Sequence, residues 1–211
     1  MNQKALERAI NATVQIPCKG GQGVLVGDGL ILTAAHCLEY DDHTGAGITL
    51  GDRPIVEIEA YDGTKLKTTP WVIESVSDVA LLGPLDNQEC WEDVEALERF
   101  CLRTNGVPIL RSAFSGQRLP VLIRSHHKKW ITGEAEQTHS RAHRAWVEAR
   151  EQIEGGTSGG PIITYDGKLV GIVSHFSEKG GACEGLTPIP HLTLPAWAVK
   201  PILKRRFEGY L

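Results

Sequence analysis

Three short segments, each beside an apolar run, limit the folds open to this chain more than any other feature. They contain His36, Asp78 and Ser158; Asp78 lies 42 residues after His36, and Ser158 lies 80 residues after Asp78. A histidine, an aspartate and a serine between glycines can act as the base, the orienting acid and the nucleophile of acyl transfer. The spacing suits one six-stranded β-barrel followed by the beginning of a second. The segments are residues 32–37, 77–82 and 155–161.

The glycines around Ser158 have a chemical reason. A nucleophilic serine needs a clear hydroxyl and a pair of backbone N–H groups aimed at a developing oxyanion. Glycines on both sides of it allow positive φ and a close approach of a substrate carbonyl. Taken alone, the segment could also be a plain turn before the strand 161–164, just as the histidine and the aspartate alone could be structural. Their joint occurrence favours a triad.

Asp78 is a better candidate for the orienting acid than the other aspartates of the first half. An acid that holds a histidine tautomer must be buried beside the ring, and the apolar run 79–82 supplies that burial. The competing aspartates stand in polar or turn-like surroundings with no apolar strand behind them. They are Asp41, Asp42, Asp52, Asp62 and Asp86.

The chain order histidine, aspartate, serine is that of the chymotrypsin-type double barrel. Through these motifs residues 12–193 resemble the chymotrypsin-like (trypsin-like) serine peptidases, closest to their compact bacterial-type branch. The resemblance implies an all-β fold of two six-stranded antiparallel Greek-key barrels. It also implies that the N–H groups of Gly156 and Ser158 form an oxyanion hole and that Ser174 supports Asp78.

The residue before Ser158 departs from the secreted members of that family. Their oxyanion hole is switched on when a cleaved N-terminus, usually Ile-Val-Gly-Gly, pairs with an aspartate at this position. Here the residue is Thr157, and no such N-terminal cassette exists. We therefore expect folding itself, or a protein partner, to set the oxyanion hole.

The resemblance also implies four substrate-binding residues. Gln152, six residues before Ser158, stands at the expected pocket floor, where relatives that select lysine or arginine have aspartate. Ser174 ends the strand along one wall of the cleft, and His175 and Phe176 follow it where relatives have a tryptophan and a glycine that line the pocket mouth. We expect a narrowed pocket without a carboxylate for lysine or arginine, which prefers small or medium residues before the scissile bond.

The length of the chain suits two barrels of about 100 residues each. Residues 1–104 are expected to form the N-terminal barrel and a connector, and to carry His36 and Asp78. Residues 105–211 are expected to form the C-terminal barrel, which carries Ser158, and a terminal helix.

Helical patterns interrupt the β pattern in three places. Residues 90–103 space their apolar side chains as on one helix face, which predicts a helical connector between the barrels. Residues 195–208 predict a C-terminal helix. Residues 1–10 read as a short amphipathic helix and not as a signal peptide, because they lack an apolar core and a cleavage site. Aspartate-glycine pairs at 62–63 and 166–167 predict hairpins.

The five cysteines, an odd number without paired spacing, favour reduced thiols and a cytoplasmic setting. Secreted relatives pair the cysteine after the catalytic histidine with one further upstream. Here Cys37 is present, but Gly21 stands near the partner position, and Cys18 stays an alternative partner. No metal site is expected: zinc-type CxxC or CxxH spacings are lacking, and His139 and His143 fit a solvated loop better than a pair of ligands.

Charge and hydropathy narrow the possible partners. The formal net charge of −4 gives no electrostatic reason for binding nucleic acid or an anionic membrane. No run of 18 apolar residues indicates a membrane-spanning helix.

The residues and the resemblance together indicate a serine endopeptidase that hydrolyses polypeptides through a covalent acyl-enzyme, without metal or cofactor. A protease in the cytoplasm must be restrained, so we expect narrow specificity or control by a regulatory protein partner. Two alternatives stay open. One is a catalytically silent binding module on the same fold, and the other is an esterase for non-peptide substrates.

Overall fold

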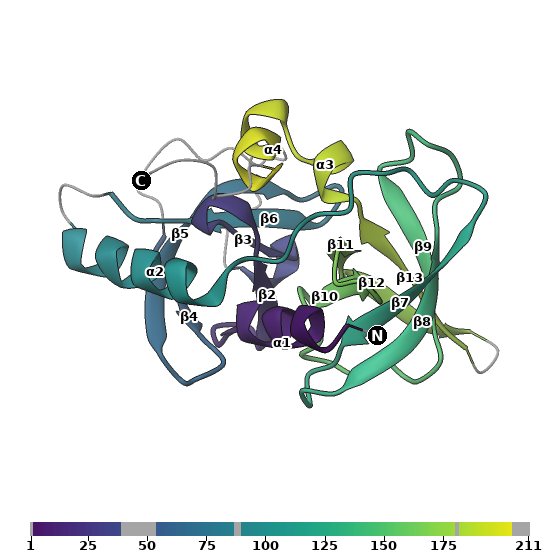
Figure 1. Cartoon of the computed structure of the whole chain (residues 1–211), viewed down its shortest axis with the longest axis horizontal. Coiled ribbons are helices and arrows are strands. Elements are labelled where there is room, and N and C mark those ends of the chain that lie inside the picture. The colour runs from purple at the N-terminus through teal and green to yellow at the C-terminus, as the bar shows by residue number, and fades with distance from the viewer. Residues whose placement is uncertain (1, 39–53, 87–89, 180–181, 204–211) are drawn as a thin grey trace.

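The structure, a computed structural model, describes residues 2–38, 54–86, 90–179 and 182–203. Figure 1 shows two β units side by side, the earlier half of the chain on the left and the later half on the right. Three of the competing acids lie outside the described residues, namely Asp41, Asp42 and Asp52.

The first unit is a closed six-stranded barrel with the strand order β1-β2-β3-β6-β5-β4. Its strands are β1 (Thr13–Ile16), β2 (Gly21–Leu25), β3 (Ile31–Thr33), β4 (Val56–Glu59), β5 (Lys65–Glu74) and β6 (Val79–Gly83). In β4, Val56 and Ile58 are buried while Glu57 is exposed, so the period of two selects its inward face. The predicted hairpin joins β4 to β5, and Gly63 has the positive φ of +84° that its turn requires.

The second unit is one seven-stranded antiparallel sheet with the order β11-β10-β7-β8-β9-β13-β12. Its strands are β7 (Arg118–Arg124), β8 (Trp130–Glu136), β9 (Arg144–Ala149), β10 (Pro161–Thr164), β11 (Leu169–Ile172), β12 (His175–Lys179) and β13 (Ala182–Pro188). The strands β11 and β12 lie at opposite ends of this order, yet only Val173 and Ser174 separate them along the chain. The sheet must therefore curl until its two ends meet.

The predicted fold class, an all-β double barrel, is confirmed. The second unit has seven strands where six were expected, because one long strand is divided into β11 and β12. At the division, Val173 exchanges backbone hydrogen bonds with the Ser158 loop: Gly159 N donates to Val173 O at 2.7 Å, and Val173 N donates to Gly160 O at 2.8 Å. Beyond it the chain leaves β10 and pairs with β13.

Helices lie at the three predicted places, whereas the short helix at 190–193 and the two 3-10 turns were not predicted. They are α1 (Gln3–Ala12), α2 (Trp91–Thr104), α3 (Pro190–Thr193) and α4 (Ala196–Leu203), with 3-10 turns η1 (Gly27–Gly29) and η2 (Ala35–Cys37). The connector α2 carries Glu92 and Asp93 in its first turn, where the helix dipole favours acids. The helix α4 forms part of the C-terminal helix predicted for residues 195–208. Positions 204–208 lie outside the described residues.

Two hydrophobic clusters form the interior. The larger fills the first barrel and continues into the second unit, and the smaller lies within the second unit. The two barrels therefore share packed side chains, while the division at residue 104 stays a prediction. The residues that extend the larger cluster into the second unit are Leu122, Ile163, Leu169 and Ile172.

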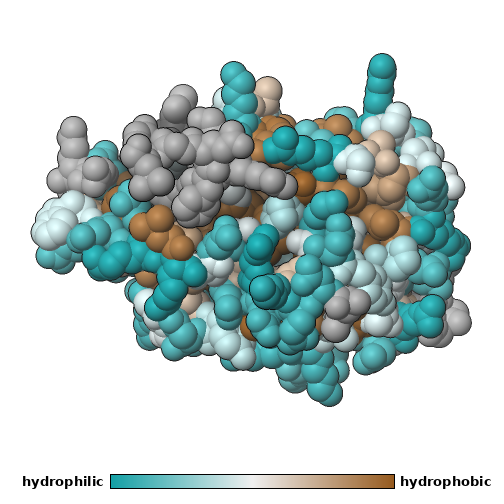
Figure 2. All heavy atoms as spheres, in the orientation of Figure 1, coloured by the Kyte–Doolittle hydropathy of each residue, from teal (hydrophilic) through white to brown (hydrophobic). Residues whose placement is uncertain are grey.

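Polar side chains cover most of the face shown in Figure 2, and hydrophobic ones gather near α3 and α4. Trp197 of α4 is 54% exposed. None of the helices among the described residues has the length and apolar character needed to cross a bilayer.

Candidate active site

His36 and Asp78 meet at one end of the first barrel. His36 lies in η2, shortly after β3, and Asp78 immediately precedes β6, the neighbour of β3. His36 Nδ1 and Asp78 Oδ2 are 2.8 Å apart, and the backbone N–H of His36 donates to Asp78 Oδ1 at 3.0 Å. With the Nδ1–H donating to the carboxylate, Nε2 can accept a proton, which is the tautomer that a catalytic base needs.

The Asp78 carboxylate also binds the second unit. Ser174, at the division between β11 and β12, donates its Oγ–H to Asp78 Oδ2 at 2.6 Å, the contact that the resemblance implied. Asp78 itself has a φ of +56°, a left-handed conformation that aspartate tolerates better than most residues. Three hydrogen bonds from two units therefore fix the position of this carboxylate.

The charges of His36 and Asp78 favour each other. The hydrogen bond that His36 donates to Asp78 raises the pKa of His36 above its ordinary value; Cys37 adds to the rise, and partial burial opposes it. Burial raises the pKa of Asp78, but the hydrogen bonds from His36 and Ser174 outweigh it, so the net pKa lies below the ordinary value. An ionised Asp78 thus stabilises the imidazolium that forms when His36 takes up a proton.

Ser158 lies in the glycine-rich loop between β9 and β10. Two glycines of this loop, Gly156 and Gly159, have φ values of +83° and +77°. A Cβ at Gly159 would lie 1.9 Å from Gln22 O, so no larger residue fits there. The N–H groups of Gly156 and Ser158 donate no hydrogen bond within the described part of the chain. Their role as an oxyanion hole stays a prediction.

The three predicted triad residues line a single open pocket of about 600 Å³. Among the described residues, no hydrogen bond joins His36 to Ser158. Catalytic hydrogen bonds are often long in a free enzyme and shorten when substrate binds. The structure brings the base, the acid and the serine together, and their catalytic roles stay predictions.

Three of the four predicted substrate-binding residues line this pocket: Ser174, His175 and Phe176. Gln152 does not, because its side chain is exposed and lies outside the lining, whereas Ile153 contributes to it. The backbone N–H of Ile153 donates to Cys183 Sγ at 3.3 Å, which holds this segment against β13. The prediction for Gln152 is therefore displaced by one residue: its neighbour Ile153 lines the pocket instead.

Three further lining residues were not predicted: Ser75, Arg144 and Glu154. Arg144 begins β9 and donates a hydrogen bond to Val76 O. Glu154 Oε2 lies 2.6 Å from His127 Nε2. The sequence predicts no carboxylate at the pocket floor, and the Glu154 carboxylate that lines the pocket already has a histidine partner. Neither charged residue stands in a recognisable motif, so the sequence carries no signal that would have found them.

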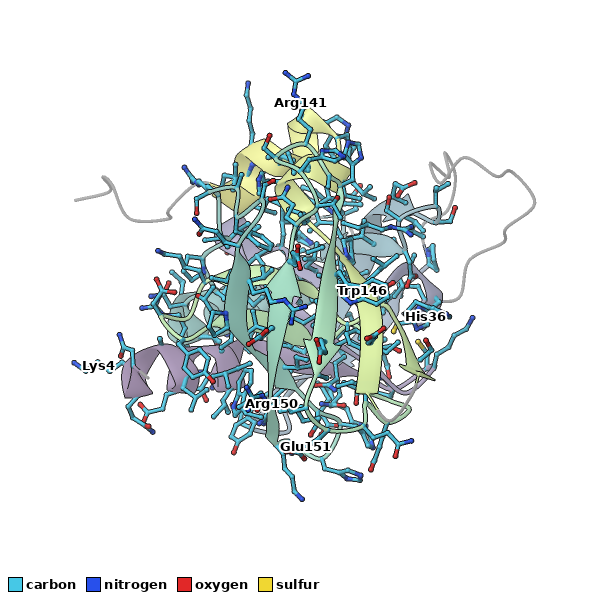
Figure 3. All side chains as sticks on the ribbon, turned by 90° about the vertical axis from the view of Figure 1, so that its right-hand side faces the viewer. Lys4, His36, Arg141, Trp146, Arg150 and Glu151 are labelled. Carbon is cyan, nitrogen blue, oxygen red and sulfur yellow. The ribbon has the colours of Figure 1, made fainter. Side chains whose placement is uncertain are left out.

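The loop between β8 and β9 contains His139 and His143, as predicted for a loop. In Figure 3, Arg141 of this loop lies at the upper end of the second unit, and Arg150 and Glu151, which precede the Ser158 loop, lie at its lower end. Within residues 2–38, 54–86, 90–179 and 182–203, no group of three or more histidine, cysteine or acidic side chains is arranged to hold a metal ion.

Cys18 and Cys37 are separate thiols in the structure. Cys18 Sγ lies 3.6 Å from the carbonyl oxygen of Cys37 and forms no bond to its sulfur. A Cβ at Gly21 would lie 2.4 Å from Cys37 Sγ. Gly21 therefore occupies the place from which a partner cysteine could reach Cys37, as the resemblance implied.

The family model of the trypsin-like peptidase domain matches residues 21–172, which include all three candidate triad residues. No curated protein matches the chain in sequence.

Solved protease structures resemble the whole fold. The Rv3671c protease of M. tuberculosis, in its inactive form, is 16% identical with a TM-score of 0.58, and the match covers 96% of this chain and 92% of that one. The serine endoprotease from Yersinia pestis is 21% identical with a TM-score of 0.58, and the match covers 93% of this chain and 63% of that one. This chain thus spans less than two thirds of the Yersinia enzyme. At such identities the likeness establishes the fold alone.

Proposed function

This chain belongs to the trypsin-like peptidase domain family and is a serine-type peptidase, and from this premise we propose that it is an endopeptidase with the triad His36, Asp78 and Ser158. The observation that carries the proposal is the pair of hydrogen bonds from His36 to Asp78, made in a pocket that Ser158 also lines. A base with an oriented ring, a serine hydroxyl in the same pocket, and two N–H groups without an acceptor among the described residues support acyl transfer.

The reaction follows from these groups. His36 Nε2 takes the proton of the Ser158 hydroxyl while Oγ attacks the carbonyl carbon of a peptide bond, and the carbonyl oxygen becomes an oxyanion between the N–H groups of Gly156 and Ser158. The C–N bond then breaks, and His36 returns the proton to the leaving amine. Water, deprotonated by His36, hydrolyses the acyl ester and restores the serine. Asp78 stays ionised throughout and stabilises the imidazolium.

A fluorophosphonate probe tests the proposal. The probe reacts with a serine that a neighbouring base activates, so the folded wild-type chain should be labelled at Ser158, identified by peptide mass. Ser158→Ala should not be labelled, and Ser177→Ala, which changes another serine, should be labelled like the wild type. A folded wild-type chain that resists the probe would contradict the proposal.

Two other functions fit the same site. The lack of a direct His36–Ser158 hydrogen bond among the described residues is as compatible with a silent binding module as with a free enzyme, and the same probe separates the two because a silent module would not be labelled. An esterase would be labelled, but it would hydrolyse ester substrates and leave peptide substrates intact. Turnover of a denatured protein substrate supports the endopeptidase.

We also propose a cytoplasmic setting and restrained activity. The separate thiols of Cys18 and Cys37 support a reducing compartment. Restraint would come from a narrow substrate range, or from a regulatory protein partner. Phe176, which lines the pocket, supports a preference for small or medium residues before the scissile bond.

A further inference from the structure

Gln22 of β2 connects the first barrel to the loop that carries Ser158. Its side chain is 1% exposed. Its backbone N–H donates to Ser158 O at 2.8 Å, and its side-chain Nε2 donates to Gly156 O at 3.2 Å. A buried amide is costly unless it is hydrogen-bonded, and here its bond goes to the oxyanion loop.

The two carbonyl groups that Gln22 binds belong to the same residues as the two proposed oxyanion donors. A peptide unit is planar, so fixing the carbonyl of Gly156 or Ser158 limits rotation about the bond between its Cα and its carbonyl carbon. Gly156 needs such a limit more than most residues, because glycine at a φ of +83° has many alternative conformations open to it. Gln22 therefore fixes the peptide planes on both sides of the 157–158 peptide, which carries the Ser158 N–H, and it limits one of the two backbone dihedral angles at Gly156.

The loop also packs directly on the Gln22 backbone. Thr33 Oγ1 donates to Gln22 O at 2.6 Å, which holds this part of β2 in place. A Cβ at Gly159 would lie 1.9 Å from the same oxygen. There is no space for the loop to move towards the first barrel without displacing Gln22.

A second contact holds the loop from the other side. Thr157 is fully buried, and its Oγ1 accepts a hydrogen bond from the backbone N–H of His126 at 3.1 Å. The loop thus lies between two neutral anchors, Gln22 on one barrel and His126 on the other. Neither anchor depends on a charged chain terminus.

We propose that Gln22 is a positioning residue that holds the N–H groups of Gly156 and Ser158 in the arrangement that binds the oxyanion. The inference rests on the proposed endopeptidase function. It predicts that the Gln22 amide acts on the chemical step more than on substrate binding, because the oxyanion exists only after attack on the carbonyl.

The test compares Gln22→Met with Thr68→Val on a peptide that the wild type cleaves. Methionine keeps the length of glutamine and loses the N–H donor. Thr68→Val removes a buried hydrogen bond of the same barrel, from Thr68 Oγ1 to Val56 O, away from the loop. Gln22→Met should lower kcat by at least about tenfold and change KM by less than about threefold, while Thr68→Val should leave kcat within about twofold of the wild type. Melting temperatures show that each variant is folded.

Equal kcat values for Gln22→Met and the wild type would overturn the proposal, and so would equal losses in the two variants. If Gln22→Met does not fold, Gln22→Asn, whose amide is too short to reach Gly156 O, takes its place under the same criteria. Cleavage by the wild type and its loss in Ser158→Ala test the endopeptidase function first. A failure of that function is therefore distinct from a failure of the role of Gln22.

Discussion

Asp78 accepts hydrogen bonds from two different atoms of His36, the ring Nδ1 at 2.8 Å and the backbone N at 3.0 Å. One bond sets the direction of the ring, and the other ties the main chain of η2 to the same carboxylate. A change at Asp78 therefore affects the orientation of the base and its charge together.

Replacing Asp78 by asparagine should lower kcat/KM by about 10⁴-fold, because the amide favours the wrong histidine tautomer. Peptide hydrolysis by the purified, folded variant measures the effect. Asp86→Asn serves as a control, since this competing acid does not line the pocket, and it should stay near the wild-type rate. The reverse pattern would assign the acid elsewhere.

Ser158→Ala and His36→Ala should each lower kcat by roughly 10⁴-fold or more, and the double variant should be no slower than the worse single one. The reason is that nucleophile and base act as one unit, so removal of either ends the same pathway. Single-turnover rates on one substrate provide the comparison. Losses that multiply in the double variant would mean that the two residues act separately.

The pKa of His36 should fall when Asp78 is replaced. Asp78 raises the pKa of His36 in the folded chain, so the NMR titration midpoint of the His36 ring should move to lower pH in Ser158→Ala/Asp78→Asn than in Ser158→Ala. A raised pKa also means that the pair stabilises the fold most below the pKa of unfolded histidine, and that this contribution is lost as the pH rises through the folded pKa. The difference in Tm between the two variants should accordingly shrink at alkaline pH. An unchanged or higher midpoint would contradict the pairing.

Activity should not require cleavage near the N-terminus. The residue before the serine is the buried Thr157, which accepts a hydrogen bond from His126 instead of pairing with a terminal amine. Protein with Met1 intact, confirmed by mass, should react with the fluorophosphonate probe at a rate that does not increase after trimming. Reaction seen only in trimmed protein would show that the loop needs a new terminus.

Peptides with alanine, valine or threonine before the scissile bond should be cleaved at least about tenfold faster than those with lysine or arginine. Phe176 lines the pocket, and the Glu154 carboxylate is hydrogen-bonded to His127, so a substrate cation finds no unpaired acid among the described lining residues. Fluorogenic peptides varied at that one position measure the preference. Phe176→Gly should widen tolerance towards leucine and phenylalanine. If lysine or arginine is preferred, Glu154→Gln should abolish the preference and would identify Glu154 as its cause.

The triad candidates could be predicted because they lie in local patterns, and the double barrel was implied by the family resemblance that these patterns carry. His36 follows one buried strand and Asp78 precedes another, and these strands, β3 and β6, are neighbours in the barrel. Adjacent strand ends bring their flanking residues together, so two short motifs were enough to indicate the pair. Ser158 was recognisable because its glycines allow the positive φ values that the loop adopts.

The pocket wall could not be predicted in the same way. Whether Gln152 or Ile153 faces the pocket depends on the path of an irregular segment, which is held by a contact between Ile153 N and Cys183 Sγ 30 residues away. Arg144 reaches the pocket only through the position of β9 in the curled sheet. Such placements follow from long-range packing, which leaves no periodic trace in the sequence.

The two residues between β11 and β12 contact both the serine loop and the acid of the proposed site. Val173 exchanges hydrogen bonds with Gly159 and Gly160 beside the serine, and Ser174 binds the Asp78 carboxylate of the first barrel. Each half of the chain thus supplies groups that have no chemical use without the other. If the gene were split at the connector, neither product alone would be active. Selection for catalysis is therefore also selection for the packing of one barrel against the other.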